Sequence, residues 1–174
     1  MASPTITTTT MSITTMTTTT MVSPVPPSRE EQMGYYFGLL SRPRLIARSS
    51  TNPWVRRRDG ESALGKSLSL VGRDHPIIGL WNDRNSALRQ RITPIIRGID
   101  WTDVRVLRIG YDTTYWTREE SEQPVTLLIE VKKDSTSWEQ AYTVVVACRA
   151  VLEQCGIHDV HVEIRQPREH FFQF

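Results

Sequence analysis

Hydrophobic positions recur with a helical period in the middle of the chain. Pro76 can open a short helical turn that runs through Trp81, because proline suits the first position of a helix. After Ser86, apolar side chains recur at i, i+4 and i+7, which predicts a second, longer helix. Pro94 interrupts this pattern, so we expect a kink or an early end there, with Gly98 closing the segment.

The period then changes to the alternation that is typical of strands. Residues 104–111 are rich in β-forming side chains, and residues 125–131 place apolar side chains on one face and polar ones on the other. We expect two antiparallel neighbours joined by the polar loop of residues 112–123. Residues 160–165 alternate in the same way and predict a third strand with one solvated face.

A long helix between the second and third strands is the clearest element in the sequence. Ser137 is a natural N-cap, Gln140 completes a capping box, and Gly156 stands where a helix C-terminus favours glycine. The apolar stripe between them consists of Ala141, Val144, Val145, Cys148, Val151, Leu152 and Cys155. Valine has modest helix propensity, so burial of this stripe must hold the helix.

The element order is helix, strand, strand, helix, strand, which predicts an α+β fold built as a two-layer α/β sandwich. The helix of residues 137–155 connects two strands by a right-handed crossover, which makes those strands parallel. Because the first two strands are antiparallel, the three-stranded sheet is mixed. A fourth edge strand from the N-terminal half would bring the layout near a ferredoxin-like fold.

Composition divides the chain into four segments. Residues 1–34 are rich in threonine and proline without an apolar face, which predicts a disordered tail. Residues 35–74 mix arginines, aromatic residues and prolines without either period, and we interpret them as a basic arm and loop that can pack onto the domain. The α/β domain then covers residues 75–168, and residues 169–174 form a C-terminal tail.

The net charge of the chain is only +2, but the charge is unevenly distributed. Residues 1–100 hold 13 Lys/Arg against 7 Asp/Glu, and residues 101–174 hold 8 against 12. A basic arm can contact nucleic acid, but its arginine clusters are short and lack interleaved aromatics. A solvated arm, or one folded onto the acidic domain, explains them better. No stretch reaches the ~20 apolar residues of a membrane span. We expect a cytoplasmic or nuclear protein without membrane contact, with mitochondria as the less favoured compartment.

Several runs of residues carry a likeness to a known group of proteins. They are Ile-Asp-Trp-Thr at 99–102, Arg-Ile-Gly-Tyr at 108–111, Ser-Trp at 137–138, Asp-Val-His-Val-Glu-Ile-Arg at 159–165, and residues 35–54 with Ala-Arg-Ser-Ser at 47–50. These runs resemble a family of uncharacterised proteins from filamentous fungi. The likeness spans most of the chain outside the threonine-rich tail. That family has no named activity, so the resemblance implies none.

A G-x-x-x-x-G-K-S pattern is formed by Gly60, Gly65, Lys66 and Ser67. In a nucleotide-binding P-loop, backbone N–H groups hold the phosphates, the lysine reaches the β and γ oxygens, and the serine ligates Mg²⁺. The surroundings do not suit this site, because no buried strand precedes it and Pro76 follows too soon for a helix. A flexible loop is the better interpretation, and nucleotide binding is an alternative.

A second candidate site has the residue types of a metal-dependent nuclease. Asp112 ends one predicted strand, and Glu130 and Lys132 form an E-x-K on the next, with both side chains on one face. In restriction-type nucleases, an acid and an E-x-K on adjacent strands hold a metal and orient water for attack. An exposed cross-strand pair explains the same residues, so catalysis is again only an alternative.

A third set consists of His158, His161, Glu163 and His170, of which His161 and Glu163 share a strand face. Zinc binding would need further ligands that nothing in the sequence marks, and surface histidines explain this set better. We therefore expect no metal and no cofactor.

Large aromatic residues near loops and strand ends favour a binding role. If Trp101, Tyr111, Tyr115 and Trp116 are exposed together, they form the kind of patch that marks a partner contact. Packing of the arm on the domain edge is the alternative. We therefore favour a non-enzymatic interaction or binding module with a protein partner that the sequence does not identify.

Overall fold

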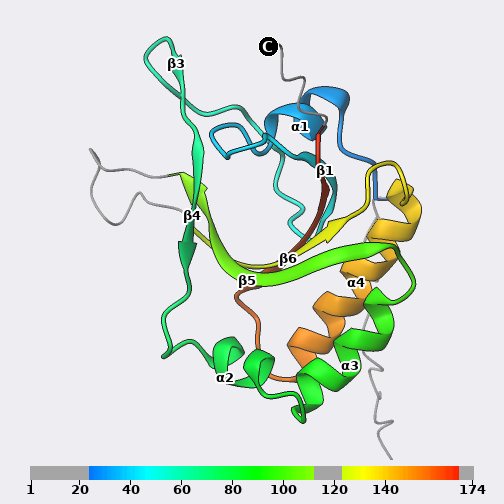
Figure 1. The fold of residues 1–174 in the computed structure, drawn as a ribbon. Helices are drawn as coiled ribbons and strands as arrows, with labels where there is room; N and C mark the ends of the chain where they lie inside the picture. Colours follow the sequence, from blue (N-terminus) through cyan, green and yellow to red (C-terminus); the bar gives the residue numbers. More distant parts are fainter. Residues whose placement is uncertain (1–23, 112–122, 169–174) are drawn as a thin grey trace, which may run out of the picture.

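The structure, a computed structural model, describes residues 24–111 and 123–168, which form an α+β fold. Figure 1 shows a curved sheet with helices α3 and α4 beneath its convex side and helix α1 on the opposite side. The helices are α1 (Arg29–Gly34), α2 (Pro76–Asn82), α3 (Ala87–Ile96) and α4 (Trp138–Gln154). The strands are β1 (Arg44–Arg48), β2 (Arg58–Asp59), β3 (Ser62–Ala63), β4 (Lys66–Leu70), β5 (Trp101–Tyr111), β6 (Val125–Val131) and β7 (Val160–Gln166).

Five strands form one mixed sheet in the order β1-β7-β6-β5-β4. The antiparallel β5–β6 pair and the parallel β6–β7 pair, which α4 connects, confirm the three-stranded arrangement that the sequence predicts. The arm adds one antiparallel strand at each edge, β1 beside β7 and β4 beside β5. In a ferredoxin-like sheet a further strand splits the β-α-β unit. Here β6 and β7 are direct neighbours, so the ferredoxin-like layout is not formed.

Helix α4 begins and ends where the sequence predicts. The Ser137 hydroxyl accepts a hydrogen bond of 3.3 Å from the Gln140 amide, and the Gln140 side chain accepts one of 3.0 Å from the Ser137 amide. Gly156 follows the helix with φ +76°, a conformation that glycine adopts without strain. Helix α3 starts after its N-cap Ser86 as expected. It continues past Pro94 to Ile96, so the helix does not end early at the proline.

The larger core lies between the sheet and helices α2, α3 and α4. Alternate side chains of β6 and β7 point into it, and the apolar stripe of α4 covers them. Its fully buried members include Ile77, Leu88, Ile92, Leu127, Ile129, Val145, Leu152 and Ile164. The valines of α4 are weak helix formers. Burial of its apolar stripe in this core therefore supplies the stabilisation that the helix needs.

The opposite face of the sheet is covered as well, so the predicted solvated face of β7 is wrong. A second cluster consists of Tyr35, Tyr36, Leu39, Leu45, Ile109 and Leu128. Glu163, on the β7 face that was expected to be solvated, is only 4% exposed. The arm supplies this cover, because Tyr35 and Tyr36 pack directly on that face. The sheet is therefore enclosed by helices on one side and by the arm on the other.

The arm is an integral part of the domain, so the predicted boundary at residue 75 is wrong. It contributes two strands of the main sheet, and each has five residues, too few for an alternating pattern to stand out. Residues 29–34, which composition assigns to the tail, form helix α1. The predictions for residues 1–23 and 169–174 lie outside the described residues. No helix within the described ranges is long and apolar enough to cross a membrane.

Two loops cross at Gly38 and Gly65 with their backbones in contact. A Cβ atom on Gly65 would lie 2.9 Å from the Cα of Gly38, which itself has φ +97°. At the same crossing the Lys66 amide donates a hydrogen bond of 2.6 Å to the Phe37 carbonyl. The crossing fixes the start of β4 against the loop that follows α1.

Candidate functional site

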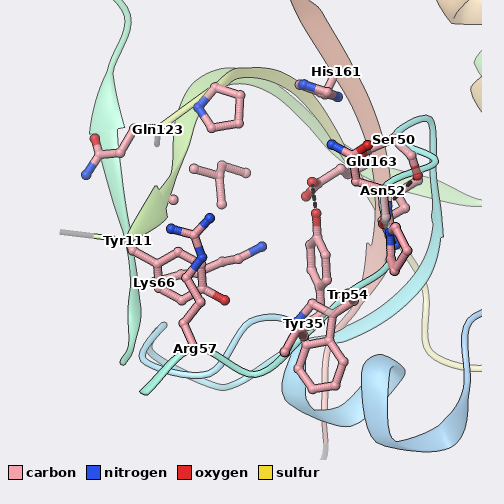
Figure 2. Close-up of a pocket in the computed structure, with 16 residues that line it drawn as sticks. Tyr35, Ser50, Asn52, Trp54, Arg57, Lys66, Tyr111, Gln123, His161 and Glu163 are labelled. Atoms are coloured by element: carbon pink, nitrogen blue, oxygen red, sulfur yellow. Dashed lines mark hydrogen bonds between the residues drawn. The ribbon is translucent and has the colours of Figure 1, made fainter. Parts of the chain in front are cut away.

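A pocket of about 740 Å³ opens on the face of the sheet that is turned away from α3 and α4. Its walls come from the arm, from β4 and the end of β5, and from β7 (Figure 2). The lining includes the basic side chains of Arg48, Arg57 and Lys66 and the single carboxylate of Glu163. Among the described lining residues, positive charges therefore outnumber negative ones.

Glu163 is held at one wall of the pocket by two tyrosine hydroxyls. Tyr35 donates a hydrogen bond of 2.5 Å to Glu163 Oε1 (Figure 2), and Tyr36 donates one of 2.7 Å to Oε2. The two rings meet edge to face with centroids 4.9 Å apart. Burial and the negative charge of Glu163 raise the pKa of both tyrosines well above the ordinary value, so both hydroxyls remain protonated donors.

Lys66 reaches into the pocket from the first position of β4, as Figure 2 shows. Its Nζ lies 3.3 Å from the centroid of the Tyr35 ring, and the centroids of Tyr36 and Tyr111 are 5.7 and 5.9 Å away. The side chain is partly buried and forms no ion pair with any other described residue. Burial lowers the pKa of Lys66 to about 8, although the charge of Glu163 opposes this effect.

Arg48, in contrast, is anchored within the protein. Its Nε lies 2.7 Å from Glu31 Oε1 in α1, and its Nη2 donates a hydrogen bond of 2.7 Å to the Asn52 carbonyl. A further hydrogen bond goes from Nη1 to the Ser50 carbonyl. Arg48 therefore ties α1 to the loop after β1 and strengthens a wall of the pocket.

Aromatic side chains give the pocket flat apolar surfaces. The guanidinium of Arg57 lies over the Tyr111 ring, with Cζ 5.0 Å from the centroid. The indole N–H of Trp54 is buried at the wall and finds no acceptor in the described part of the chain. Burial lowers the pKa of His161, on the same strand face as Glu163, so this imidazole is neutral near pH 7. The pocket thus combines ring surfaces, a cation and hydrogen-bond donors.

The residues of the G-x-x-x-x-G-K-S pattern do not adopt the P-loop geometry that the nucleotide-binding alternative requires. Gly60, with φ +56°, lies in the turn between β2 and β3, and Gly65 packs against another loop. Lys66 and Ser67 open a strand instead of a helix, and the Ser67 hydroxyl accepts a hydrogen bond of 3.1 Å from the Gln123 side chain. Because no helix begins here, the backbone amides of this segment are not gathered at a helix N-terminus where they could hold phosphates.

The nuclease residues are not assembled among the described residues either. Glu130 pairs with Arg165 on β7, with Nε 3.0 Å from Oε2, so a cross-strand ion pair accounts for it. Lys132 follows the end of β6 and is exposed, and Asp112 lies outside the described residues.

In the third set zinc binding is the less favoured alternative, and the members that the structure describes do not come together as a metal site. His161 and Glu163 share a face as expected, but within residues 24–111 and 123–168 no three His, Cys, Asp or Glu side chains are grouped to hold a metal. His158 is exposed, and His170 lies outside the described residues.

Of the four aromatic residues predicted for partner contact, the two that the structure describes lie at opposite ends of β5. Tyr111 lines the pocket at the end of β5, whereas Trp101, 42% exposed, stands at the other end of the same eleven-residue strand. That length separates the two residues by about 30 Å. Tyr115 and Trp116 lie outside the described residues.

Sequence reasoning missed Tyr35, Tyr36 and Trp54 as site residues. It considered Lys66 for nucleotide binding and Glu163 for zinc binding, and the described residues form neither site. A usable signal was present, because β7 carries a histidine and a carboxylate on the second face of a strand whose first face is apolar. Polar side chains on the second face of a strand indicate either a solvent-exposed face or a functional site. Whether these side chains are buried in the structure decides between the two.

Comparison of the chain with protein-family models, with curated proteins and with solved structures finds no match. The resemblance to uncharacterised fungal proteins therefore stays a prediction.

Proposed function

We propose that this chain is a non-enzymatic binding module whose pocket takes a small organic anion with a flat apolar body. The observation that carries the proposal is the Lys66 side chain, partly buried in the pocket without an ion pair to another described residue. A buried cation without a charged partner is costly, and an anionic ligand would supply that partner.

The walls of the pocket support a ligand of this shape and orientation. Its volume of about 740 Å³ lies within the ~300–1,000 Å³ of small-molecule sites. The partly buried rings of Trp54 and Tyr111 line the pocket and suit a flat body. Because Glu163 would repel an anion, the negative group is expected on the side of Lys66 and Arg57. We place this binding role in the cytoplasm or nucleus, in keeping with the sequence.

Thermal unfolding with benzoate and with benzamide tests the proposal, since the two probes share a ring and differ in charge. We expect millimolar benzoate to raise the melting temperature and benzamide to leave it unchanged. Lys66→Met should abolish the benzoate shift, and Lys132→Met, a change at an exposed lysine, should retain it. Phenyl phosphate shows whether a phosphate serves as well as a carboxylate. Equal shifts with benzoate and benzamide, or none with either anion, would refute the proposal.

A further inference from the structure

We propose that Lys66 holds its ligand covalently, through a reversible imine between Nζ and an aldehyde or ketone carbon. The inference rests on the proposed function, because the pocket is the same. It adds that the organic anion bears a carbonyl group within reach of β4.

The placement of Lys66 among the three lysines of the chain supports this role. Lys132 and Lys133 are exposed on the turn after β6, and Lys133 Nζ lies 3.9 Å from Asp134. Only Lys66 lines the pocket, where its Nζ lies over the Tyr35 ring (Figure 2). An amine in this position meets a bound ligand directly, without first breaking an ion pair to a described residue.

The nucleophile in imine formation is the neutral amine, and burial increases its population. With a pKa of about 8, roughly a quarter of Lys66 is neutral at pH 7.5. An ordinary lysine with a pKa near 10.4 is neutral to only about 0.1%. Lys66 therefore presents on the order of 200 times more nucleophile than an exposed lysine at the same pH.

The reaction conserves atoms and electrons with the carbonyl ligand as the only co-reactant. The nitrogen lone pair forms a C–N bond while the carbonyl π pair moves to oxygen, and the oxygen takes up the proton that the nitrogen releases. The carbinolamine then loses its oxygen and two protons as water, and C=N remains. Hydrolysis reverses these steps. The protonated imine is a cation, so both the Tyr35 ring face and the charge of Glu163 favour it.

Borohydride trapping with 4-formylbenzoate at pH 7.5 tests the inference on the full chain. Reduction turns an imine into a stable secondary amine, and mass mapping of peptides assigns it to a lysine. We expect at least tenfold more adduct on Lys66 than on Lys132 or Lys133. We also expect the Lys66 yield to rise with pH around 8. Adduct spread evenly over the three lysines, or absent from Lys66, would overturn the imine.

Two variants and one neutral probe separate this result from the proposed function. Lys66→Arg keeps the charge but cannot form an imine, so it should lose trapping and still respond to benzoate; Lys132→Met should trap like the parent chain. If 4-formylbenzoate raises the melting temperature but leaves no adduct on Lys66, the imine is wrong and anion binding stands. Equal trapping of 4-formylbenzamide on Lys66 would support the imine and contradict the preference for an anion.

Discussion

Neighbouring residues of β6 and β7 point to opposite faces of the sheet, and the two faces bury different kinds of side chain. Toward α3 and α4 the buried side chains are aliphatic, with Leu127 and Ile164 among them. Toward the arm, apolar contacts alternate with a buried carboxylate, two tyrosine hydroxyls and a lysine. The first face forms the larger apolar core. The second face also carries polar groups that line the pocket.

The difference shows how one sheet can carry an apolar core on one face and a polar pocket on the other. Aliphatic side chains gain from burial in any arrangement that fills space. Glu163 instead needs donors at fixed positions, and the arm supplies them from residues about 130 positions away in the chain. The buried carboxylate on the arm face therefore depends on these long-range contacts.

The largest expected effect compares Leu127→Ala with Leu128→Ala, which empty equivalent volumes on opposite faces. The side chains are 0% and 2% exposed. Leu127→Ala should lower the free energy of unfolding by about 3–5 kcal/mol, measured in urea. Leu128→Ala should cost about 2–3 kcal/mol, because the smaller cluster beneath the arm can close over the cavity. Equal losses would show that the arm packs as firmly as the helices.

A second comparison lies within the arm face, at the carboxylate. Tyr36→Phe removes one donor to buried Glu163 and should cost about 1.5–3 kcal/mol, the range for hydrogen bonds to charged groups. Because Glu163→Gln disturbs the same bond, the double variant should lose clearly less than the sum of the two single losses. Additive losses would mean that the hydroxyl and the carboxyl group do not interact.

Stability of the arm face should also depend on pH through Lys66. Between about pH 8 and pH 10.5 the unfolded chain still binds a proton that the folded protein has released, so this group adds stability as the pH rises. Glu163 and Glu31 oppose the lowered pKa, and Arg48 and Arg57 support it. We expect the free energy of unfolding, relative to Lys66→Met, to increase from pH 8 to pH 10.

The measurement should stop near pH 10 because the tyrosines then act in the opposite direction. Their raised pKa values mean that the folded protein keeps protons which the unfolded chain loses above pH 10, so their contribution falls as the pH rises further. A flat difference between the parent chain and Lys66→Met from pH 8 to pH 10 would contradict an amine destabilised by burial.

The smallest expected effect compares the N-caps of the two layers. Ser137→Ala removes the cap of the seventeen-residue α4 and should cost about 1 kcal/mol, read from urea unfolding. Ser28→Ala removes the corresponding cap of the six-residue α1. There the Ser28 hydroxyl accepts a hydrogen bond of 3.2 Å from the Glu31 backbone amide. A loss of about 0.5 kcal/mol is expected there, at the lower end of the range for caps. A larger loss at Ser28 would place α1 among the main supports of the fold.

The helix face could be predicted from the sequence, because its signals are local. The capping box of Ser137 and Gln140 and the alternation of β6 and β7 lie within short windows. The arm face could not, since its contacts are long-range: Tyr35 and Glu163 meet across 128 positions of the chain. The sequence marks Lys66 only as part of a phosphate-binding pattern. In the structure Lys66 instead lines a pocket with aromatic walls.

The pairing of β1 with β7 also delays completion of the sheet during synthesis of the chain. Translation adds about 5–20 residues per second, so β1 waits on the order of ten seconds before its partner leaves the ribosome. During that interval the arm has neither its strand partner nor the carboxylate that its tyrosines bind. A nascent chain therefore cannot complete the pocket before β7 has been made, because His161 and Glu163 of β7 line it.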